Sequence, residues 1–219
     1  MNTAPAFRID HLHRLHAGPD TPPVEHGWLT PNHGGPLRAP RLIVLHYTAG
    51  DTTEGSVRWL CDAGAKASAH LVVGRYGKVY QLLGLATEAW HAGVSRWGKQ
   101  TSLNHSSIGI EMANLGHLTP VQGRYQTPAR VPIDAARILH AAHRGGGPVL
   151  AWERYPAPQV ATIVALCAAL QTRYPTITEI VGHDDIAPGR KTDPGPAWEW
   201  PAFRRALAAH TTPSEPHHV

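Results

Sequence analysis

The 219-residue sequence has little cysteine and no long apolar segment. Its two cysteines, Cys61 and Cys167, each lie among apolar residues at helical spacing, and no C-x-x-C pair occurs. Two buried thiols are therefore expected, rather than a disulfide or a sulfur-ligated zinc. Because nowhere do about 18 apolar residues follow one another, no membrane span is expected. The N-terminal residues also lack the basic leader and apolar stretch of a classical export signal.

Charge is scarce and only slightly unbalanced. Charged residues make up 16% of the chain and apolar residues 42%, enough for one core, so we predict a single domain with tails. The formal net charge of +4 suits an anionic partner, but the basic residues are dispersed and form no nucleic-acid-binding motif. Sixteen histidines is a high count. Since histidine is the commonest metal ligand, their number justifies a search for a metal site.

Apolar runs predict the strands of a central sheet. Residues 42–45 (LIVL) indicate a buried strand that ends at His46, and residues 107–113 (SIGIEMA) indicate a second one. In the second strand Glu111 lies opposite the apolar face, so it points either to solvent or into a site. A hairpin is expected over residues 69–83.

Helical spacing of apolar residues predicts helices between these strands. Strands interleaved with helices indicate an α/β (mixed α+β) fold, with a central, mostly mixed sheet flanked by helices. The expected helices cover residues 53–63, with an Asp51/Glu54 capping box; 133–144, closed by three glycines; 158–174, with Pro158 in the first turn; and a final helix from about Pro201.

The predicted domain has irregular segments around it. Residues 1–40 are rich in Pro, Gly and His without sustained periodicity, so we expect an irregular lead-in. The domain itself covers residues 41–209, with an insertion at about 116–157, and residues 210–219 form a flexible tail.

The segment 183–196 (HDDIAPGRKTDPGP) combines closely spaced polar groups with Pro and Gly residues that prevent a regular helix. A divalent metal bound to His183 and Asp193 would hold such a loop in place. A catalytic zinc needs a third protein ligand, for which His46 at its strand end is the candidate. On spacing alone, the Asp-Asp pair that follows His183 competes with Asp193, and any single one of these residues is more often a cap or a solvated group.

Five separated stretches, in this order, carry a resemblance: LIVLHYTAG (42–50), SAHLVVGRYGKVYQLL (68–83), AWHAGVSRW (89–97), SIGIEMAN (107–114) and GHDDIAPGRKTDPGPAWEW (182–200). Together they resemble the type-2 family of N-acetylmuramoyl-L-alanine amidases, which includes bacterial muropeptide amidases, small phage lysozymes and peptidoglycan recognition proteins. The resemblance implies the fold of that family. It also implies zinc-dependent hydrolysis of the amide bond between N-acetylmuramic acid and L-alanine in peptidoglycan or muropeptides.

The resemblance assigns roles to five residues. His46, His183 and Asp193 match the ligands of one zinc ion. Glu111 matches the acidic residue that acts as general base on the attacking water, and Lys191 matches the cation that stabilises the oxyanion. These roles fit together, because zinc acidifies water, a carboxylate accepts the proton and an ammonium stabilises negative charge. Alternatively, Glu111 is a solvent-facing strand residue and Lys191 pairs with an acidic neighbour at the surface.

Four more residues match the family as substrate-binding positions. Trp90 and His91 lie in a segment that lines the family's substrate groove, although core packing is an alternative for both. Arg75, in the hairpin turn, is expected to meet a stem-peptide carboxylate or solvent, and Asn114 to hydrogen-bond substrate. His70 is expected to be a structural, hydrogen-bonded histidine, because the zinc ligands are complete without it.

The sequence departs from the family pattern at three places. Tyr76-Gly77 replaces the usual acidic-Gly turn, and Ala69 stands where phage lysozymes have a catalytic tyrosine. The Ala69 change fits the branch of the family that uses an acidic residue at the position of Glu111. The segment 116–157 is longer than usual, which leaves the size of the substrate open.

A non-catalytic peptidoglycan-binding module of the same fold is the main alternative. Such modules typically lack one metal ligand, whereas all three positions are filled here. A serine or cysteine hydrolase is disfavoured, because the chain has no G-x-S-x-G and no cysteine in a polar segment.

The expected partner is peptidoglycan or a muropeptide, bound by a monomer, with no nucleic-acid or membrane partner. Synthesis in the cytoplasm is expected, followed by action there, or on the cell wall after phage-type release or delivery by a secretion system. The sequence does not decide between intact sacculi and anhydro-muropeptides.

Overall fold

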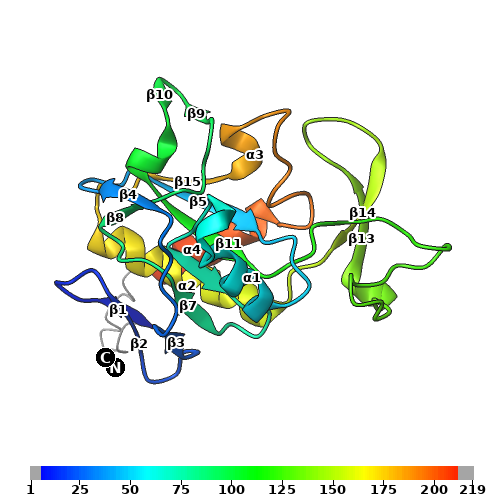
Figure 1. Ribbon diagram of the computed structural model, residues 1–219, viewed down its shortest axis with the longest axis horizontal. Helices are drawn as coiled ribbons and strands as arrows, with labels where there is room; N and C mark the ends of the chain where they lie inside the picture. The colour runs from blue at the N-terminus through cyan, green and yellow to red at the C-terminus, as the bar shows by residue number, and fades with distance from the viewer. Residues whose placement is uncertain (1–5, 212–219) are drawn as a thin grey trace, which may run out of the picture.

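In the computed structural model, which describes residues 6–211, the central element is a six-stranded sheet with the order β15-β5-β11-β6-β7-β3 (Figure 1). Its strands are β15 (Glu179–Gly182), β5 (Leu42–Tyr47), β11 (Ser107–Met112), β6 (Leu71–Val73), β7 (Val79–Gln81) and β3 (Val24–Glu25). The first four run parallel, β7 is antiparallel to β6, and β3 is parallel to β7. The mixed sheet that the sequence predicts is thus confirmed, and four carboxyl ends meet at one edge.

One face of this sheet is covered by two helices, α2 (Ala157–Arg173) and α4 (Trp200–Thr211). Alternate strand residues such as Leu45 and Ile110 pack there against Leu166 and Phe203. Helix α2 has its proline in the first turn, as predicted, because that position needs no amide donor. Cys167 is buried in this core. Cys61 is half-buried and only partly meets the prediction of two buried thiols, and neither cysteine forms a disulfide.

The opposite face of the sheet is covered by loops and short helices. Leu42, Val44 and Val181 pack there against Ala92 and Leu103. Because strand side chains alternate, His46 and Glu111 belong to this face, opposite α2. The covering elements include β9 (Arg96–Trp97), β10 (Gln100–Thr101), the 3-10 helix η2 (Leu103–Ser106) and the short helix α3 (His183–Ile186).

The described part of the N-terminal lead-in is more regular than predicted. Strands β1 (Phe7–Ile9) and β2 (Leu15–Ala17) form a hairpin, β3 joins the main sheet, and β4 (His33–Pro36) pairs with β8 (Thr87–Ala89). These strands are at most four residues long, too short for a periodic pattern to show in the sequence. Burial of Phe7 and Leu15 against the main core holds the hairpin in place.

The insertion also differs from prediction, because the helix expected over residues 133–144 is absent. A 3-10 helix, η3 (Ala135–Arg137), leads into β13 (Ile138–Ala142), and β14 (Val149–Glu153) and β12 (His117–Leu118) complete a three-stranded antiparallel sheet. This sheet projects at the right of Figure 1. The glycines expected to end a helix instead form the β13–β14 turn, where Gly146 and Gly147 have φ of 93° and 103°. Buried Trp152 packs under the turn and fixes the strand pairing.

Two helix starts differ in detail. Helix α1 (Thr53–Leu60), followed by the 3-10 helix η1 (Ala63–Ala65), is capped by Thr52, whose Oγ1 accepts from the Gly55 amide at 3.0 Å. The predicted capping box is absent, because Glu54 instead accepts from the Tyr80 hydroxyl at 2.6 Å. The loop that starts at residue 183 begins with the one-turn α3, where no helix was expected.

Two further expectations concern the C-terminal tail and membrane-spanning segments. Most of the tail expected at residues 210–219 lies outside the described residues. Within residues 6–211 no helix is both long and apolar enough to cross a bilayer.

Candidate metal centre

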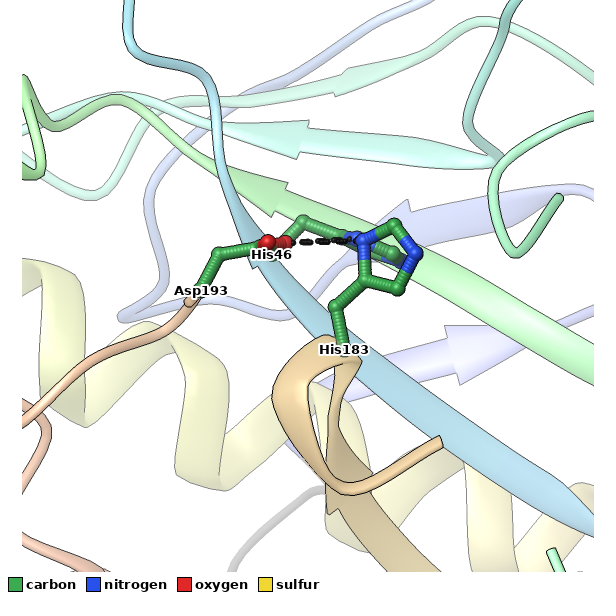
Figure 2. Close-up of side chains that lie close together, drawn as sticks. All are labelled: His46, His183 and Asp193. Atoms are coloured by element: carbon green, nitrogen blue, oxygen red, sulfur yellow. Dashed lines mark hydrogen bonds and ion pairs between the residues drawn. The ribbon is translucent and has the colours of Figure 1, made fainter. Parts of the chain in front are cut away.

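Three side chains meet where β5 and β15 end (Figure 2). His46 lies near the end of β5, and His183 follows β15 directly. The register pairs Gly182 with Leu45, so the next residue along each strand brings the two histidines side by side. Asp193 lies beside the two histidines at the far end of the loop that His183 begins. A hydrogen bond of 2.8 Å from the Asp184 amide to the Asp193 carbonyl closes this loop.

The three polar atoms form a nearly equilateral triangle. His46 Nδ1 and His183 Nδ1 lie 2.9 Å apart, and each lies 3.0 Å from Asp193 Oδ2. All three residues are buried, with exposed fractions of 1%, 3% and 7%. Among the described residues this is the one cluster of histidine, cysteine and acidic side chains whose ligand atoms are close enough to share a metal ion.

The protonation of the rings favours a cation at this point. Burial, together with the charge of His183, lowers the pKa of His46 to about 4, so its ring is neutral near pH 7. His183 Nε2 lies 3.2 Å from the Ala92 carbonyl, and Nδ1 lies 3.0 Å from Asp193 Oδ2, so a cation at the triangle would take the place of a proton on Nδ1. Lone pairs that face one another and a carboxylate repel unless a cation lies between them. Two imidazoles and a carboxylate are a donor set that zinc accepts.

Glu111 lies beside the triangle, because β11 pairs it with His46. Its Oε2 atom is buried and has no hydrogen-bond partner among the described residues. Burial and the negative charge of Asp193 raise the pKa of Glu111 to about 8, against the opposing effect of Lys191. An unpartnered carboxylate next to a second carboxylate is a further indication that this place suits a cation. The residue as a whole is half-buried, with Oε2 turned away from solvent.

The Asp-Asp pair after His183 does not join the triangle. Asp184 accepts from His143 Nε2 at 2.9 Å and from Arg144 NH2 at 2.5 Å, and Asp185 pairs with Arg144 at 2.7 Å. Both aspartates therefore attach the metal loop to the β13–β14 turn of the insertion. Half-buried Lys191 forms no ion pair with either of them in the described part of the chain, which leaves its charge free to act on Glu111.

Arg75 and Asn114 lie on a pocket of about 460 Å³ at the same edge of the sheet, which none of the three triangle residues lines. The Arg75 guanidinium pairs at 2.7 Å with Glu153, which also pairs with Arg137. Asn114 is buried, donates to the Glu153 carbonyl at 3.2 Å and accepts from the Gly116 amide at 2.7 Å. Arg75 thus meets a carboxylate of its own chain, and the Asn114 amide is engaged by the backbone.

Trp90 and His91 occupy different surroundings. Trp90 is half-buried, and its backbone amide donates to Ser68 Oγ at 2.8 Å. His91 is buried behind His46, with both ring nitrogens hydrogen-bonded inside the protein, so the structure gives it a different place from a groove-lining one. Burial, together with the neighbouring histidines, holds the pKa of His91 well below its ordinary value, which keeps the ring neutral.

His70 and Ala69 both lie in the interior of the protein, outside the ligand triangle. His70 is fully buried, with Nδ1 accepting from the Gly109 amide at 3.0 Å and Nε2 donating to the Thr87 carbonyl at 2.9 Å. This is the structural role expected for it. Ala69 packs in the apolar cluster beneath α1 and brings no polar group to the site.

Several residues that support the site were missed by sequence reasoning. Arg144 holds the metal loop, Arg190 donates to the Ala92 carbonyl at 2.9 Å, and Ser107 bonds His91. Gly109 was missed as well, and it alone of these positions carried a signal. A glycine inside a strand often marks a place where another group comes close to the backbone, and here that group is the His91 ring.

Comparisons with known proteins agree with this geometry. A family described as N-acetylmuramoyl-L-alanine amidase matches residues 36–196. The 1,6-anhydro-N-acetylmuramyl-L-alanine amidase AmpD of Escherichia coli K12 is 32% identical over 151 residues, which cover 68% of this chain and 63% of the relative. The N-acetylmuramoyl-L-alanine amidase AmiD of the same organism is 32% identical over 168 residues, which cover 73% of this chain and 50% of the relative.

A solved structure shows a similar fold. The complex of AmiD from E. coli with anhydro-N-acetylmuramic acid-L-Ala-D-gamma-Glu-L-Lys has a TM-score of 0.58 and 28% identity, and the match covers 76% of this chain and 57% of that one. The chain thus spans between half and two thirds of the length of these relatives.

Proposed function

The chain belongs to the N-acetylmuramoyl-L-alanine amidase family, and we propose that it hydrolyses the amide bond between N-acetylmuramic acid and the L-alanine of a stem peptide. The observation that supports this most directly is the buried triangle of His46, His183 and Asp193, with an unpartnered Glu111 carboxylate beside it. We propose zinc as the metal that these three residues would hold, because two imidazoles and one carboxylate are a donor set that catalytic zinc sites use.

The protein residues divide the work of the reaction. A zinc ion in the triangle supplies Lewis acidity, which polarises a carbonyl and acidifies an attacking water. The Glu111 carboxylate accepts the proton of that water and delivers it to the departing alanine nitrogen, so that the C–N bond breaks and a carboxylate and a free amine result. The Lys191 ammonium, whose charge reaches Glu111 and His46, stabilises the negative charge that develops on the carbonyl oxygen.

For Glu111 to accept a proton, it must be ionised at the working pH. Burial and the charge of Asp193 oppose this. A divalent cation held by the triangle would offset the charge of Asp193, which is one of the two causes that raise the pKa of Glu111. Metal binding and base function are therefore coupled in this proposal.

The substrate class is part of the proposal. The names of the relatives include 1,6-anhydro-muramyl substrates, and we propose soluble anhydro-muropeptides as substrates of this chain. The pocket at the same edge of the sheet has polar walls from Arg75, Arg137 and Glu153, which suit a peptide with charged groups. Half-buried Trp90 offers an aromatic surface for a sugar or peptide.

The test is mass spectrometry of two substrates, purified sacculi and soluble anhydro-muropeptides, after incubation with the protein. Each is treated with enzyme alone, with enzyme and chelator, and with chelated enzyme to which zinc is returned. We expect stem peptides with a free N-terminal alanine, lost on chelation and restored by zinc.

The two substrates separate the parts of the proposal. Release from muropeptides alone, or faster than from sacculi, supports the proposed substrate class, and release from sacculi alone contradicts it. Binding to either substrate without any release contradicts hydrolysis and favours the non-catalytic binding module.

A further inference from the structure

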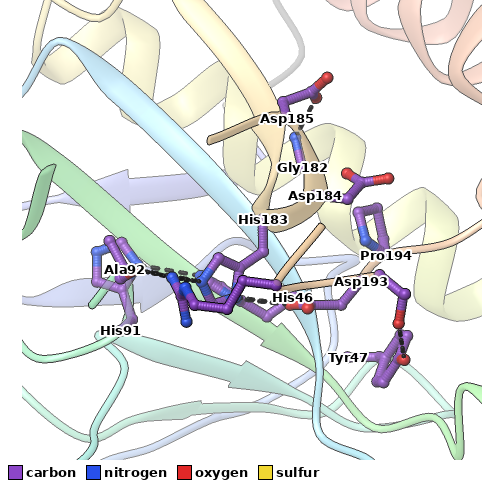
Figure 3. Close-up of polar contacts among 12 residues, drawn as sticks. His46, Tyr47, His91, Ala92, Gly182, His183, Asp184, Asp185, Asp193 and Pro194 are labelled. Carbon is purple, nitrogen blue, oxygen red and sulfur yellow. Dashed lines mark hydrogen bonds and ion pairs between the residues drawn. The ribbon is translucent and has the colours of Figure 1, made fainter. Parts of the chain in front are cut away.

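Behind His46, on the side away from Asp193, a chain of hydrogen bonds runs inward through a second histidine. His46 Nε2 lies 3.0 Å from His91 Nδ1, and His91 Nε2 lies 3.2 Å from Ser107 Oγ. The Ser107 hydroxyl in turn contacts the Leu103 carbonyl at 2.5 Å. His46 and His91 lie next to each other in Figure 3, with His91 on the side of Ala92.

The proton positions along this chain are determined by its inner end. A carbonyl only accepts, so the single proton of Ser107 points to Leu103 and its oxygen accepts from His91 Nε2. A neutral His91 with its proton on Nε2 presents a lone pair on Nδ1. When a cation occupies the triangle, His46 therefore carries its proton on Nε2 and donates it to His91; without a cation, Asp193 Oδ2, 3.0 Å from Nδ1, competes for that proton. The lone pair of His46 is then on Nδ1, the atom that faces His183 and Asp193.

The surrounding residues hold the His91 ring in this position. A Cβ atom at Gly109 would lie 2.4 Å from Cγ of the ring, so the absence of a side chain there makes room for it. Asn104 Oδ1 accepts from the amides of His91 and Ala92 at 3.1 Å and 2.8 Å, which fixes the backbone. The two rings meet edge to face, with centroids 5.1 Å apart. The ring thus has one available orientation.

We propose that His91 is a positioning residue for the metal centre: by accepting from His46 Nε2 it selects the tautomer and orientation of His46 that direct Nδ1 at the metal. This deepens the proposed function and rests on it. If His91 only filled space behind His46, any residue of similar size could replace it without a change in zinc affinity. Partners of this kind usually change metal affinity 10- to 100-fold when removed.

The experiment is a zinc titration of the metal-free protein against a chromogenic chelator, with two variants of His91. His91→Asn places an amide oxygen near the position of Nδ1 and keeps an acceptor for His46, whereas His91→Phe keeps the ring and loses the acceptor. We expect His91→Phe to weaken zinc binding on the order of 10- to 100-fold, and His91→Asn to remain within a few-fold of the parent. His70→Asn is the matched control, because His70 is a buried histidine whose ring nitrogens are hydrogen-bonded to the backbone of Thr87 and Gly109 and not to a proposed metal ligand.

A second measurement needs no variant and no metal. Nitrogen-15 shifts of the imidazole rings in the metal-free protein report which nitrogen of His46 and of His91 carries the proton. We expect the proton of His91 on Nε2, and the proton of His46 divided between Nε2, which faces His91, and Nδ1, which lies 3.0 Å from Asp193 Oδ2. In His91→Phe we expect the proton of His46 on Nδ1, because only Asp193 still accepts it.

Each outcome decides the proposal. Equal zinc affinity in His91→Phe and the parent overturns it, and so does a proton on Nδ1 of His91 in the metal-free parent, because that atom could then not accept from His46. Equal weakening in His91→Asn and His91→Phe also overturns it and assigns His91 to packing. A parent chain that binds no zinc at all contradicts the metal centre itself. Zinc binding without amidase activity contradicts only the proposed reaction, and the positioning role is still tested.

Discussion

The carboxyl edge of the main sheet and the three-stranded sheet of the insertion are built in opposite ways. In β5 every residue from Leu42 to His46 is buried, whereas in β13 none of the five residues is buried. The large core cluster lies beneath the main sheet, while the insertion holds a small one around Leu118, Ile133 and Ala151. His46 and Glu111 therefore lie on strands that are packed tightly into the core.

The two regions nevertheless meet at the metal loop. Arg144, in the turn of the insertion, pairs with Asp184 and Asp185, which directly follow His183. Glu153, at the end of β14, accepts from the Leu115 amide at 2.7 Å beside the pocket. The main sheet therefore forms the site, and the insertion supports and borders it.

The largest effect is expected from removing a ligand on the main-sheet side. His183→Ala should lose stoichiometric zinc, and activity should fall by a factor on the order of a thousand or more, because the remaining two donors no longer hold the ion. Zinc is measured by elemental analysis and activity on a muropeptide. His143→Ala is the matched control from the insertion, a histidine that contacts Asp184. It should keep its zinc, and stoichiometric zinc in His183→Ala would contradict the ligand assignment.

Replacing Glu111 should separate catalysis from metal binding. In Glu111→Gln we expect zinc to remain while kcat falls on the order of a hundredfold, because an amide of similar shape cannot accept the proton. Steady-state kinetics and zinc content are measured on the same preparation. Glu179→Gln, on the exposed start of β15, is the control and should match the parent. Unchanged kcat in Glu111→Gln would remove Glu111 from the mechanism.

A pair of leucine truncations compares the two cores directly. Leu166 is fully buried in the large cluster, so Leu166→Ala should lower the free energy of unfolding by roughly 2–5 kcal/mol. Leu118→Ala removes the same atoms from the small, shallower cluster and should cost about half as much or less. Urea denaturation of the metal-free protein measures both. Equal losses would show that the insertion is as tightly packed as the main domain.

The smallest effect is expected where the regions touch. Arg144→Ala removes the partner of two aspartates, but its side chain is half exposed, so we expect a loss of only about 1 kcal/mol in unfolding free energy. Zinc affinity should fall a few-fold, because the loop between His183 and Asp193 loses an anchor. Arg124→Ala, elsewhere on the insertion surface, is the control. If the two variants have identical zinc affinity, the insertion does not support the metal loop.

Sequence reasoning reached the ligand triangle because its signals were local. His46 ends an apolar run, and the loop with His183 and Asp193 is too rich in Pro and Gly to form a long helix. Spacing alone could not choose Asp193 over Asp184. That choice depends on Arg144, a residue about 40 positions away along the chain, which neutralises Asp184 at a distance from the triangle.

Sequence reasoning was wrong where local patterns were short or ambiguous. The apolar spacing over residues 133–144 fitted a helix, but pairing with β14 and burial of Trp152 made that segment a strand. In the lead-in, strands of two to four residues are stabilised by distant partners, which no local window contains.

The sequence by itself determined the strand periodicity, the faces on which His46 and Glu111 lie and the set of polar groups near the ends of the strands. These depend on alternation along a few residues, which the chain carries locally. Only the tertiary structure decided which carboxylate joins the two histidines, that Glu111 has no partner, and which nitrogen of His46 is free. Each depends on the register of parallel strands and on hydrogen bonds between residues far apart in sequence, which folding alone brings together.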